Sequence, residues 1–244
     1  FQHGLNGNVD QIFSLFTPPK GYRMLCLDCR GHGKTRPLGD KNKLSISDFS
    51  QDILALLEFL SIKKVIIGGI SMGAAIALTF SLKFSEYVAG LVLSRPAWLE
   101  GPMLSNASIY KNIAQLLHDY GPEKGKKLFK KTEQYLDILN LSPDSATSLL
   151  GHFEHTRFDE TIVKLERIAK DYPPIKLERL KSIVVPTLVL GNHKDPIHPF
   201  DYGKTISDLI PNAIFREITP KSEDKHQHQQ DVQTYITEFL EQIR

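Results

Sequence analysis

The sequence predicts an α/β fold, a mostly parallel β-sheet flanked by helices, with a helical cap inserted into it. Short apolar runs rich in Val, Ile and Leu alternate with amphipathic stretches, which is the pattern of strand–helix units. Between Arg95 and Pro186, however, the chain contains helical patterns and no convincing strand. A length of 244 residues with 41% hydrophobic side chains suits one large domain of this class.

Five runs are predicted as strands because each is short, β-branched and apolar almost throughout, as expected of strands covered on both faces. They are Met24–Cys29, Lys64–Gly68, Gly90–Arg95, Thr187–Gly191 and Ile214–Ile218. A helix is predicted over Ser47–Leu60, with its apolar residues on one face and Ser47 as the N-cap. The last helix is predicted from Asp231 to Ile243.

The central helical region reads as a cap laid over one end of the sheet. Helix starts are indicated at Ser105 or Asn106, at Ser142 followed by Pro143, and near Asp159. The predicted organisation is therefore a first part of the core at 1–96, a helical cap at 97–180, and a second part of the core at 181–244.

Composition argues against several functional classes. Thirty Lys+Arg against 28 Asp+Glu give a formal charge of +2, too small to indicate a nucleic-acid partner. No run of about 18 apolar residues appears, so no membrane span is expected. Cys26 and Cys29 are the only cysteines and lie in a predicted strand, which favours neither a disulfide nor a zinc site. A reducing, cytoplasmic location is the expectation.

The remaining histidines give no metal-binding pattern. His193 and His198 flank Asp195 without helical ligand spacing, and His152 and His155 are interpreted as lid surface. No metal is therefore expected.

The most informative segment is Gly69-Ile70-Ser71-Met72-Gly73, a G-x-S-x-G between an apolar strand and a helix that begins with small residues. This context is the one that a nucleophile elbow requires. A serine forced into a tight strand-to-helix turn adopts strained backbone angles, and side chains two positions before and after it would collide. Glycines at 69 and 73 remove these collisions, so Ser71 is predicted as an exposed nucleophile at a helix N-terminus.

Taken with two further motifs, the chain resembles an α/β-hydrolase with a helical cap. His3-Gly4-Leu5-Asn6-Gly7 resembles the family's loop after its third strand, and the loop from Asp28 to Thr35 resembles its D-x-R-G-H-G-x-S/T motif. The resemblance covers nearly the whole chain. In that family roughly two strands precede the first motif, and we expect either that they are missing from this sequence or that the sheet has an unusual open edge.

The resemblance implies a triad in the chain order Ser, Asp or Glu, His. Asp195 follows the strand Thr187–Gly191 inside a turn and is predicted as the acid. The usual Gly-His before the last helix is absent, and His226 and His228 both lie in the segment predicted as a loop. His228 is favoured as the base and His226 is the alternative. Backbone N–H groups of Leu5 and Met72 are predicted to form the oxyanion hole.

The sequence therefore predicts a cofactor-free serine hydrolase that cleaves a small ester, thioester or lactone through an acyl-enzyme. Two alternatives use the same fold. One is a C–C bond hydrolase or perhydrolase-type enzyme on the same triad, and the other is a hydrolase-like receptor for a small molecule with little turnover. The expected partner is a small-molecule substrate, and substrate identity and oligomeric state stay open.

Overall fold

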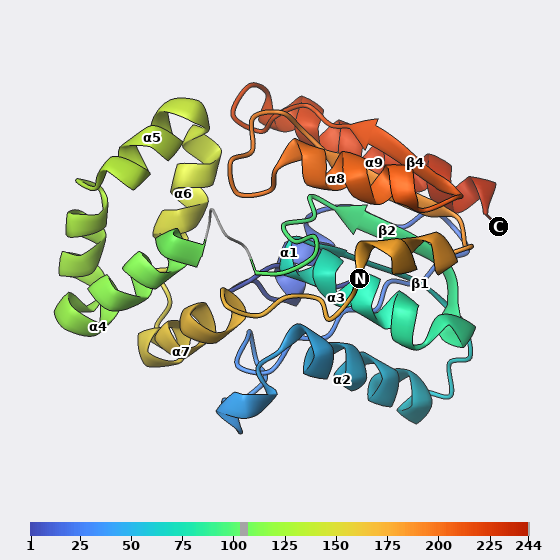
Figure 1. Ribbon diagram of the computed structural model, residues 1–244, viewed down its shortest axis with the longest axis horizontal. Coiled ribbons are helices and arrows are strands. Elements are labelled where there is room, and N and C mark those ends of the chain that lie inside the picture. The colour runs from blue at the N-terminus through green and yellow to red at the C-terminus, as the bar shows by residue number, and fades with distance from the viewer. Residues whose placement is uncertain (103–106, 244) are drawn as a thin grey trace.

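The sheet of the computed structural model, which describes residues 1–102 and 107–243, has four parallel strands in the order β1-β2-β3-β4. They span Val65–Ile70, Val88–Ser94, Thr187–Gly191 and Ala213–Glu217, and Figure 1 shows them between two layers of helices. Four of the five predicted strands are thus confirmed within a few residues. Since all four run in the same direction, their carboxyl ends meet at one edge, where Ser71 follows β1 and Asp195 follows β3.

Alternation along the strands divides the core between the two faces of the sheet. Leu91 and Leu93 of β2 belong to the larger cluster with the helices α2, α3 and α8, whereas Val92 packs in a second cluster with α9. The core helices and 3-10 turns are α1 (Val9–Phe13), α2 (Ile46–Phe59), α3 (Met72–Lys83), α8 (Phe200–Leu209), α9 (Lys225–Gln242), η1 (Lys41–Lys43), η2 (Ser85–Tyr87) and η3 (Leu177–Ser182).

The segment Met24–Cys29 is not a strand, contrary to the prediction. A strand requires a ladder of backbone hydrogen bonds to a neighbour. Toward the N-terminal residues, the Leu25 carbonyl accepts from the Phe1 ammonium at 2.6 Å and the Cys29 N–H donates to the His3 ring at 3.0 Å, which is not a ladder between two backbones. Gln2 in turn forms an isolated parallel bridge to Gly69 at the edge of β1. The segment is half-buried beside the sheet, with Cys29 as its buried residue, and no ladder forms along it.

Two helix boundaries also differ from the sequence prediction. Helix α2 is capped by Ser45, whose side chain accepts from the Asp48 N–H, and not by Ser47. Helix α9 begins at Lys225, six residues before the predicted Asp231, because the Asp224 side chain accepts from the N–H groups of its first turn. The part of the predicted loop that carries His226 and His228 is therefore helical.

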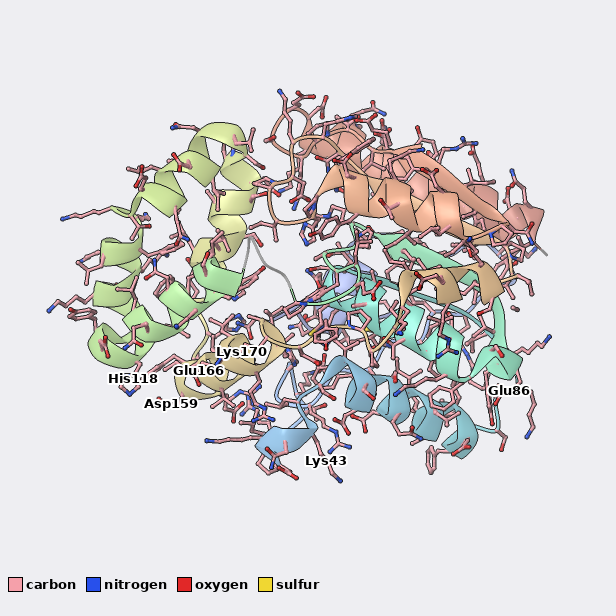
Figure 2. The ribbon with its side chains drawn as sticks, in the orientation of Figure 1. Lys43, Glu86, His118, Asp159, Glu166 and Lys170 are labelled. Carbon is pink, nitrogen blue, oxygen red and sulfur yellow. The ribbon has the colours of Figure 1, made fainter. Side chains whose placement is uncertain are left out.

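The predicted helical region lies to one side of the sheet (Figure 1). It contains α4 (Ala107–Phe129), α5 (Glu133–Leu141), α6 (Pro143–Gly151) and α7 (Phe158–Ile168). The predicted start of α6 is confirmed, with Ser142 as N-cap and proline in the first turn. The predicted start at Ser105 or Asn106 lies outside the described residues. His118 projects from the outer surface of α4 (Figure 2).

Helix α7 ties the cap to the core through two cationic side chains. Lys164 is 4% exposed and donates from Nζ to the Gly31 carbonyl at 2.9 Å, and Arg157 donates from Nη2 to the Gly33 carbonyl at 2.8 Å. Both acceptors belong to the loop that follows Met24–Cys29. Burial lowers the pKa of Lys164 to about 8, and the charge of Arg157 acts in the same direction, whereas Glu160 opposes it.

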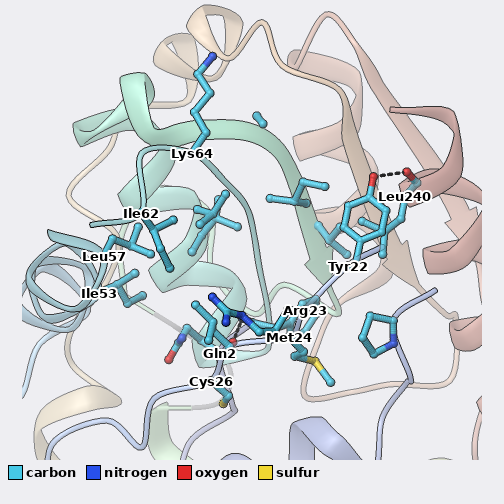
Figure 3. Close-up of a pocket in the computed structure, with 18 of the residues that line it drawn as sticks. Gln2, Tyr22, Arg23, Met24, Cys26, Ile53, Leu57, Ile62, Lys64 and Leu240 are labelled. Carbon is cyan, nitrogen blue, oxygen red and sulfur yellow. Dashed lines mark hydrogen bonds between the residues drawn. The ribbon is translucent and has the colours of Figure 1, made fainter. Parts of the chain in front are cut away.

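A cavity of about 480 Å³ lies beside β1. It is separate from the cavity at Ser71, since the two have no lining residue in common. Figure 3 shows its largely apolar walls, which include Ile53 and Leu57 of α2 and Leu240 of α9. Tyr22 crosses one side and donates from its hydroxyl to the Leu240 carbonyl at 2.6 Å. Within the described residues, no helix is both long and apolar enough to cross a bilayer.

The buried ammonium of Lys164 predicts a stability that increases in mild alkali. The folded pKa of about 8 is below the unfolded value of about 10.4, so between these limits the unfolded chain holds more protons and rising pH favours the folded state. We expect the free energy of unfolding of the wild type, relative to Lys164→Met, to rise by about 2 kcal/mol between pH 8 and pH 10. Urea denaturation of both proteins at each pH measures this difference, and a flat difference would contradict it.

Candidate active site

Ser71 sits at a strained turn between β1 and α3. Its φ and ψ are 56° and −117°, a backbone conformation that residues other than glycine rarely adopt. Ser71 is also the N-cap residue of α3. Its N–H donates to the Ser94 carbonyl at the end of β2 at 3.0 Å. The turn is therefore held by the neighbouring strand as well as by its own helix.

The two glycines around Ser71 are required by the close approach of the backbone. A Cβ on Gly69 would lie 2.2 Å from the backbone carbon and oxygen of Gly73. A Cβ on Gly73 would lie 2.1 Å from the Gln2 carbonyl oxygen. Neither obstacle is a flexible side chain, so the spacing G-x-S-x-G follows directly from the packing of this turn.

His198 is the imidazole that contacts the serine. Its Nε2 lies 2.9 Å from the Ser71 Oγ, and its Nδ1 lies 2.8 Å from the Asp195 Oδ2. An ionised carboxylate only accepts hydrogen bonds, so the Nδ1–H must be the donor to Asp195. In the neutral ring Nε2 then carries the lone pair and accepts the Ser71 hydroxyl. The three side chains are aligned for transfer of the hydroxyl proton to the ring.

Asp195 is a buried carboxylate with donors on both oxygens. Oδ1 accepts from the N–H groups of Ile197 and His198 at 3.2 and 3.1 Å, and Oδ2 accepts from His198 and from Nη1 of Arg95, the latter at 3.2 Å. Burial by itself raises the pKa of this carboxyl. The hydrogen bonds and charges of His198 and Arg95 outweigh it, so the pKa of Asp195 lies well below its ordinary value.

The structure does not place His228 or His226 at the serine. His228 is the fourth residue of α9, where its N–H donates to the Asp224 carbonyl and its Nδ1 contacts the Thr219 carbonyl at 2.7 Å. Burial, with smaller effects from Arg95 and Lys221, lowers the pKa of its ring. His226 is exposed on the first turn of the same helix. Among the hydrogen bonds of the described residues, the one that joins an imidazole to Ser71 comes from His198.

The position of His198 at Ser71, in place of His228, has a local cause that can be recognised in the sequence. His198 follows Asp195 by three residues, and the turn between them brings both the backbone N–H and the ring of His198 to the same carboxylate. In the sequence, His198 stands out only as a possible metal ligand beside Asp195. The signal for its role at Ser71 is this Asp-x-x-His spacing inside one turn. Nothing in the sequence pattern indicated that Arg95 is the second side-chain partner of the Asp195 carboxylate.

The predicted oxyanion residues border the same site. The Gly7 N–H donates to the Gly4 carbonyl at 2.9 Å, which closes a tight turn around Leu5 and Asn6. The Gly4 N–H donates to Oε1 of Gln11 at 2.8 Å. Leu5 and Ser71 line one cavity, and Met72 is the first residue of α3 directly after the serine. The structure thus places both predicted residues around Ser71, and their role as donors stays a prediction.

The two loops that carried the resemblance support this edge of the sheet. His3 is fully buried, with Nδ1 donating to the Gly4 carbonyl at 2.8 Å and Nε2 accepting from the Cys29 N–H at 3.0 Å. Asp28 accepts from the N–H groups of Val9 and Lys34 at 2.8 and 2.7 Å. Both side chains are used in holding the backbone of the loops.

A cavity of about 270 Å³ opens above Ser71, between the core and the cap. Its wall from the cap includes Tyr110 of α4 and His152, which follows α6. His152 is 7% exposed and accepts at Nδ1 from the Asn6 amide at 2.8 Å, so its interpretation as lid surface is wrong. Burial lowers the pKa of His152 to about 3, which keeps the ring neutral.

Metal ligation has no support in the described part of the chain. Within residues 1–102 and 107–243, no group of three or more His, Cys, Asp or Glu side chains is arranged to hold a metal ion. His193 contacts Glu217, and His198 contacts Ser71 and Asp195.

Comparisons with known proteins by sequence and by structure agree on one family. Residues 1–225 match the family described as alpha/beta hydrolase fold. The chain is 30% identical over 224 residues to a 2-hydroxy-6-oxononadienedioate/2-hydroxy-6-oxononatrienedioate hydrolase of Cupriavidus pinatubonensis, covering 85% of this chain and 70% of the relative. Among solved structures, an enol-lactonase from Burkholderia xenovorans LB400 superposes with a TM-score of 0.71 at 19% identity, covering 98% of this chain and 89% of the other. A thermophilic esterase from Thermogutta terrifontis gives a TM-score of 0.70 at 19% identity, covering 99% and 88%.

The steric requirement at the turn gives a stability prediction. Gly69→Ala places a Cβ against the Gly73 backbone, so the turn must shift, and we expect a loss of more than about 2 kcal/mol in the free energy of unfolding. Gly151→Ala is the matched control because its added Cβ meets no atom within 4 Å beyond its chain neighbours and its own helix backbone, and alanine favours a helix. Urea denaturation measures both. Equal stability of the two variants would contradict the packing argument.

Proposed function

The chain belongs to the alpha/beta hydrolase fold family, and from that premise we propose that it is a serine hydrolase that cleaves a small ester, thioester or lactone through an acyl-enzyme. The supporting observation is the pair of short contacts made by one imidazole, 2.9 Å to the Ser71 Oγ and 2.8 Å to the Asp195 Oδ2. This is the geometry that general-base activation of a serine requires. The proposed base is His198 in place of His228.

In the first step Ser71 Oγ attacks the acyl carbon while His198 Nε2 takes the hydroxyl proton. The carbonyl oxygen becomes an oxyanion, which the N–H groups of Leu5 and Met72 stabilise in the proposal. The imidazolium that forms is stabilised by the Asp195 carboxylate, which stays ionised because its pKa is low.

Collapse of the tetrahedral intermediate breaks the bond to the leaving group, and the proton on His198 Nε2 passes to the departing oxygen or sulfur. Water then enters, His198 removes its proton, and the hydroxide attacks the acyl-enzyme. The second tetrahedral intermediate expels Ser71, whose oxygen regains the proton from His198. The products are the acid and the alcohol or thiol, which for a lactone are the two ends of one hydroxy acid.

A fluorophosphonate probe tests the nucleophile and the base together. We expect covalent labelling of the wild type and none of Ser71→Ala. His198→Ala should lower the rate of labelling and the turnover of p-nitrophenyl esters by about three orders of magnitude, because the hydroxyl loses its proton acceptor. Labelling rates and ester turnover are measured on samples whose folded state is checked by circular dichroism.

His228→Ala and His226→Ala are the matched controls, since both rings lie on α9 away from the serine contact. Each should keep turnover within a few-fold of the wild type. Loss of activity in His228→Ala with activity retained in His198→Ala would return the base to His228. Absence of labelling in the wild type would favour the small-molecule receptor.

A second candidate, C–C bond hydrolysis on the same triad, is favoured by the relative at 30% identity. The compound in its name has a ketone and no ester linkage, so its hydrolysis breaks a C–C bond. The attack by Ser71 is unchanged, but the leaving group is a carbon that must receive the proton.

The two candidates are separated by their substrates. If the protein is an ester hydrolase, kcat/KM for p-nitrophenyl butyrate exceeds that for a 2-hydroxy-6-oxo-2,4-dienoate by at least about tenfold, with both activities lost in Ser71→Ala. The reverse order would assign C–C bond hydrolysis. Absorbance of the released p-nitrophenolate and of the consumed dienol is measured under one set of conditions.

A further inference from the structure

Two cationic side chains line the cavity that contains Ser71 and His198. Arg95 follows β2 in the chain, and Lys221 lies in the turn between β4 and α9. We propose that Arg95 and Lys221 form an anion-binding subsite, so that the substrate is an acyl compound that carries a carboxylate. This inference rests on the proposed function and adds a substrate class to it.

Arg95 is held beside the reacting atoms by its backbone. Its φ is +48°, an uncommon conformation for a non-glycine residue, and its N–H donates to the Leu190 carbonyl at 2.7 Å. The carbonyl of the preceding Ser94 accepts from the Ser71 N–H at 3.0 Å. The backbone of Arg95 is therefore tied to the same turn as Ser71, and its side chain lines the cavity that contains Ser71.

The guanidinium of Arg95 has capacity for a ligand. Its one hydrogen bond recorded among the described side chains runs from Nη1 to Asp195 Oδ2 at 3.2 Å. A guanidinium has five N–H donors in a planar fork that matches a carboxylate. The side chain is 18% exposed, against 3% for Asp195, so the cation and not the carboxylate faces the cavity.

Lys221 supplies the second positive charge from the turn between β4 and α9. Its Nζ lies 3.5 Å from Oδ1 of Asp144, which belongs to the first turn of α6 in the cap. Their side chains are 36% and 31% exposed, and ion pairs of this kind contribute little, about 0–1 kcal/mol. A substrate carboxylate can therefore replace Asp144 as the partner of Lys221 at small cost.

The positive charges of Arg95 and Lys221 both reach the surroundings of His228. Both Arg95 and Lys221 contribute to the lowered pKa of His228, after the larger effect of burial. Asp144 is the carboxylate in the described lining of the cavity, and the Asp195 carboxylate behind Arg95 balances the second cation. A substrate carboxylate therefore binds by using the remaining donors of Arg95 and by replacing Asp144 at Lys221, in the cavity that Ser71 also lines.

Paired substrates test the subsite. The mono-p-nitrophenyl ester of glutaric acid carries the carboxylate, and the corresponding glutaramide ester is its neutral isostere. We expect the wild type to prefer the acid over the amide by about tenfold or more in kcat/KM, as a hydrogen-bonded charge pair provides. Lys221→Met and Arg95→Gln should each reduce this ratio at least about fivefold, and Lys221→Arg should preserve it.

Lys204→Met is the matched control because Lys204 also pairs with a carboxylate at 3.5 Å, that of Asp208, but lies outside the cavity. Its preference should equal that of the wild type. Since Arg95 also contacts Asp195, its variant is evaluated by the ratio between the two esters, which a general loss of activity does not change.

The outcomes separate the two proposals. If both esters acylate Ser71 but the wild type shows no preference, or if Lys221→Met and Arg95→Gln leave the ratio unchanged, the subsite is overturned and the serine hydrolase stands. If neither ester is turned over and the fluorophosphonate does not label Ser71, the proposed function itself fails and the subsite with it.

Discussion

Asp195 is a buried carboxylate, and an ionised group out of water persists only where donors surround it. The donors that surround it organise this end of the molecule. Two are backbone N–H groups of the following turn, which determine the path of the chain to His198. The third is the ring of His198, which is thereby directed at Ser71, and the fourth is Arg95, which brings a permanent positive charge to the cavity. The orientation of His198 toward Ser71 and the position of a cation thus have one electrostatic cause.

The second constraint is steric and acts on Ser71. Ser71 projects from a turn in which three stretches of backbone come together, namely β1, α3 and the chain at Gln2. There is no room for a Cβ at Gly69 or Gly73, and the Ser71 N–H is held by the end of β2. Because Arg95 directly follows that end, the strand that supports the serine also delivers the guanidinium. A rigid sheet edge is a suitable base for such contacts, since its strands cannot move independently.

The cap completes the cavity with polar side chains. Tyr110, His152 and Asp144 face the sheet edge from helices or turns of the cap, and Lys164 and Arg157 join α7 to a core loop. His152 meets Asn6 in the turn next to Leu5, so the cap touches the segment proposed to hold the oxyanion. The cavity of about 270 Å³ is therefore small and polar, in contrast to the apolar cavity of about 480 Å³ beside β1.

The sequence by itself determined the features that depend on local pattern. Apolar runs located four parallel strands, glycine spacing located the turn at Ser71, and a Ser-Pro pair located the start of α6. It did not determine which imidazole meets the serine. Asp224 starts α9 early and turns His228 toward Thr219, whereas the turn after Asp195 brings His198 to Ser71, 127 residues away in the chain. Met24–Cys29 likewise has the composition of a strand, but strand formation requires a neighbour. Only the tertiary structure decided these points, because they depend on contacts between segments that periodicity and spacing do not relate to one another.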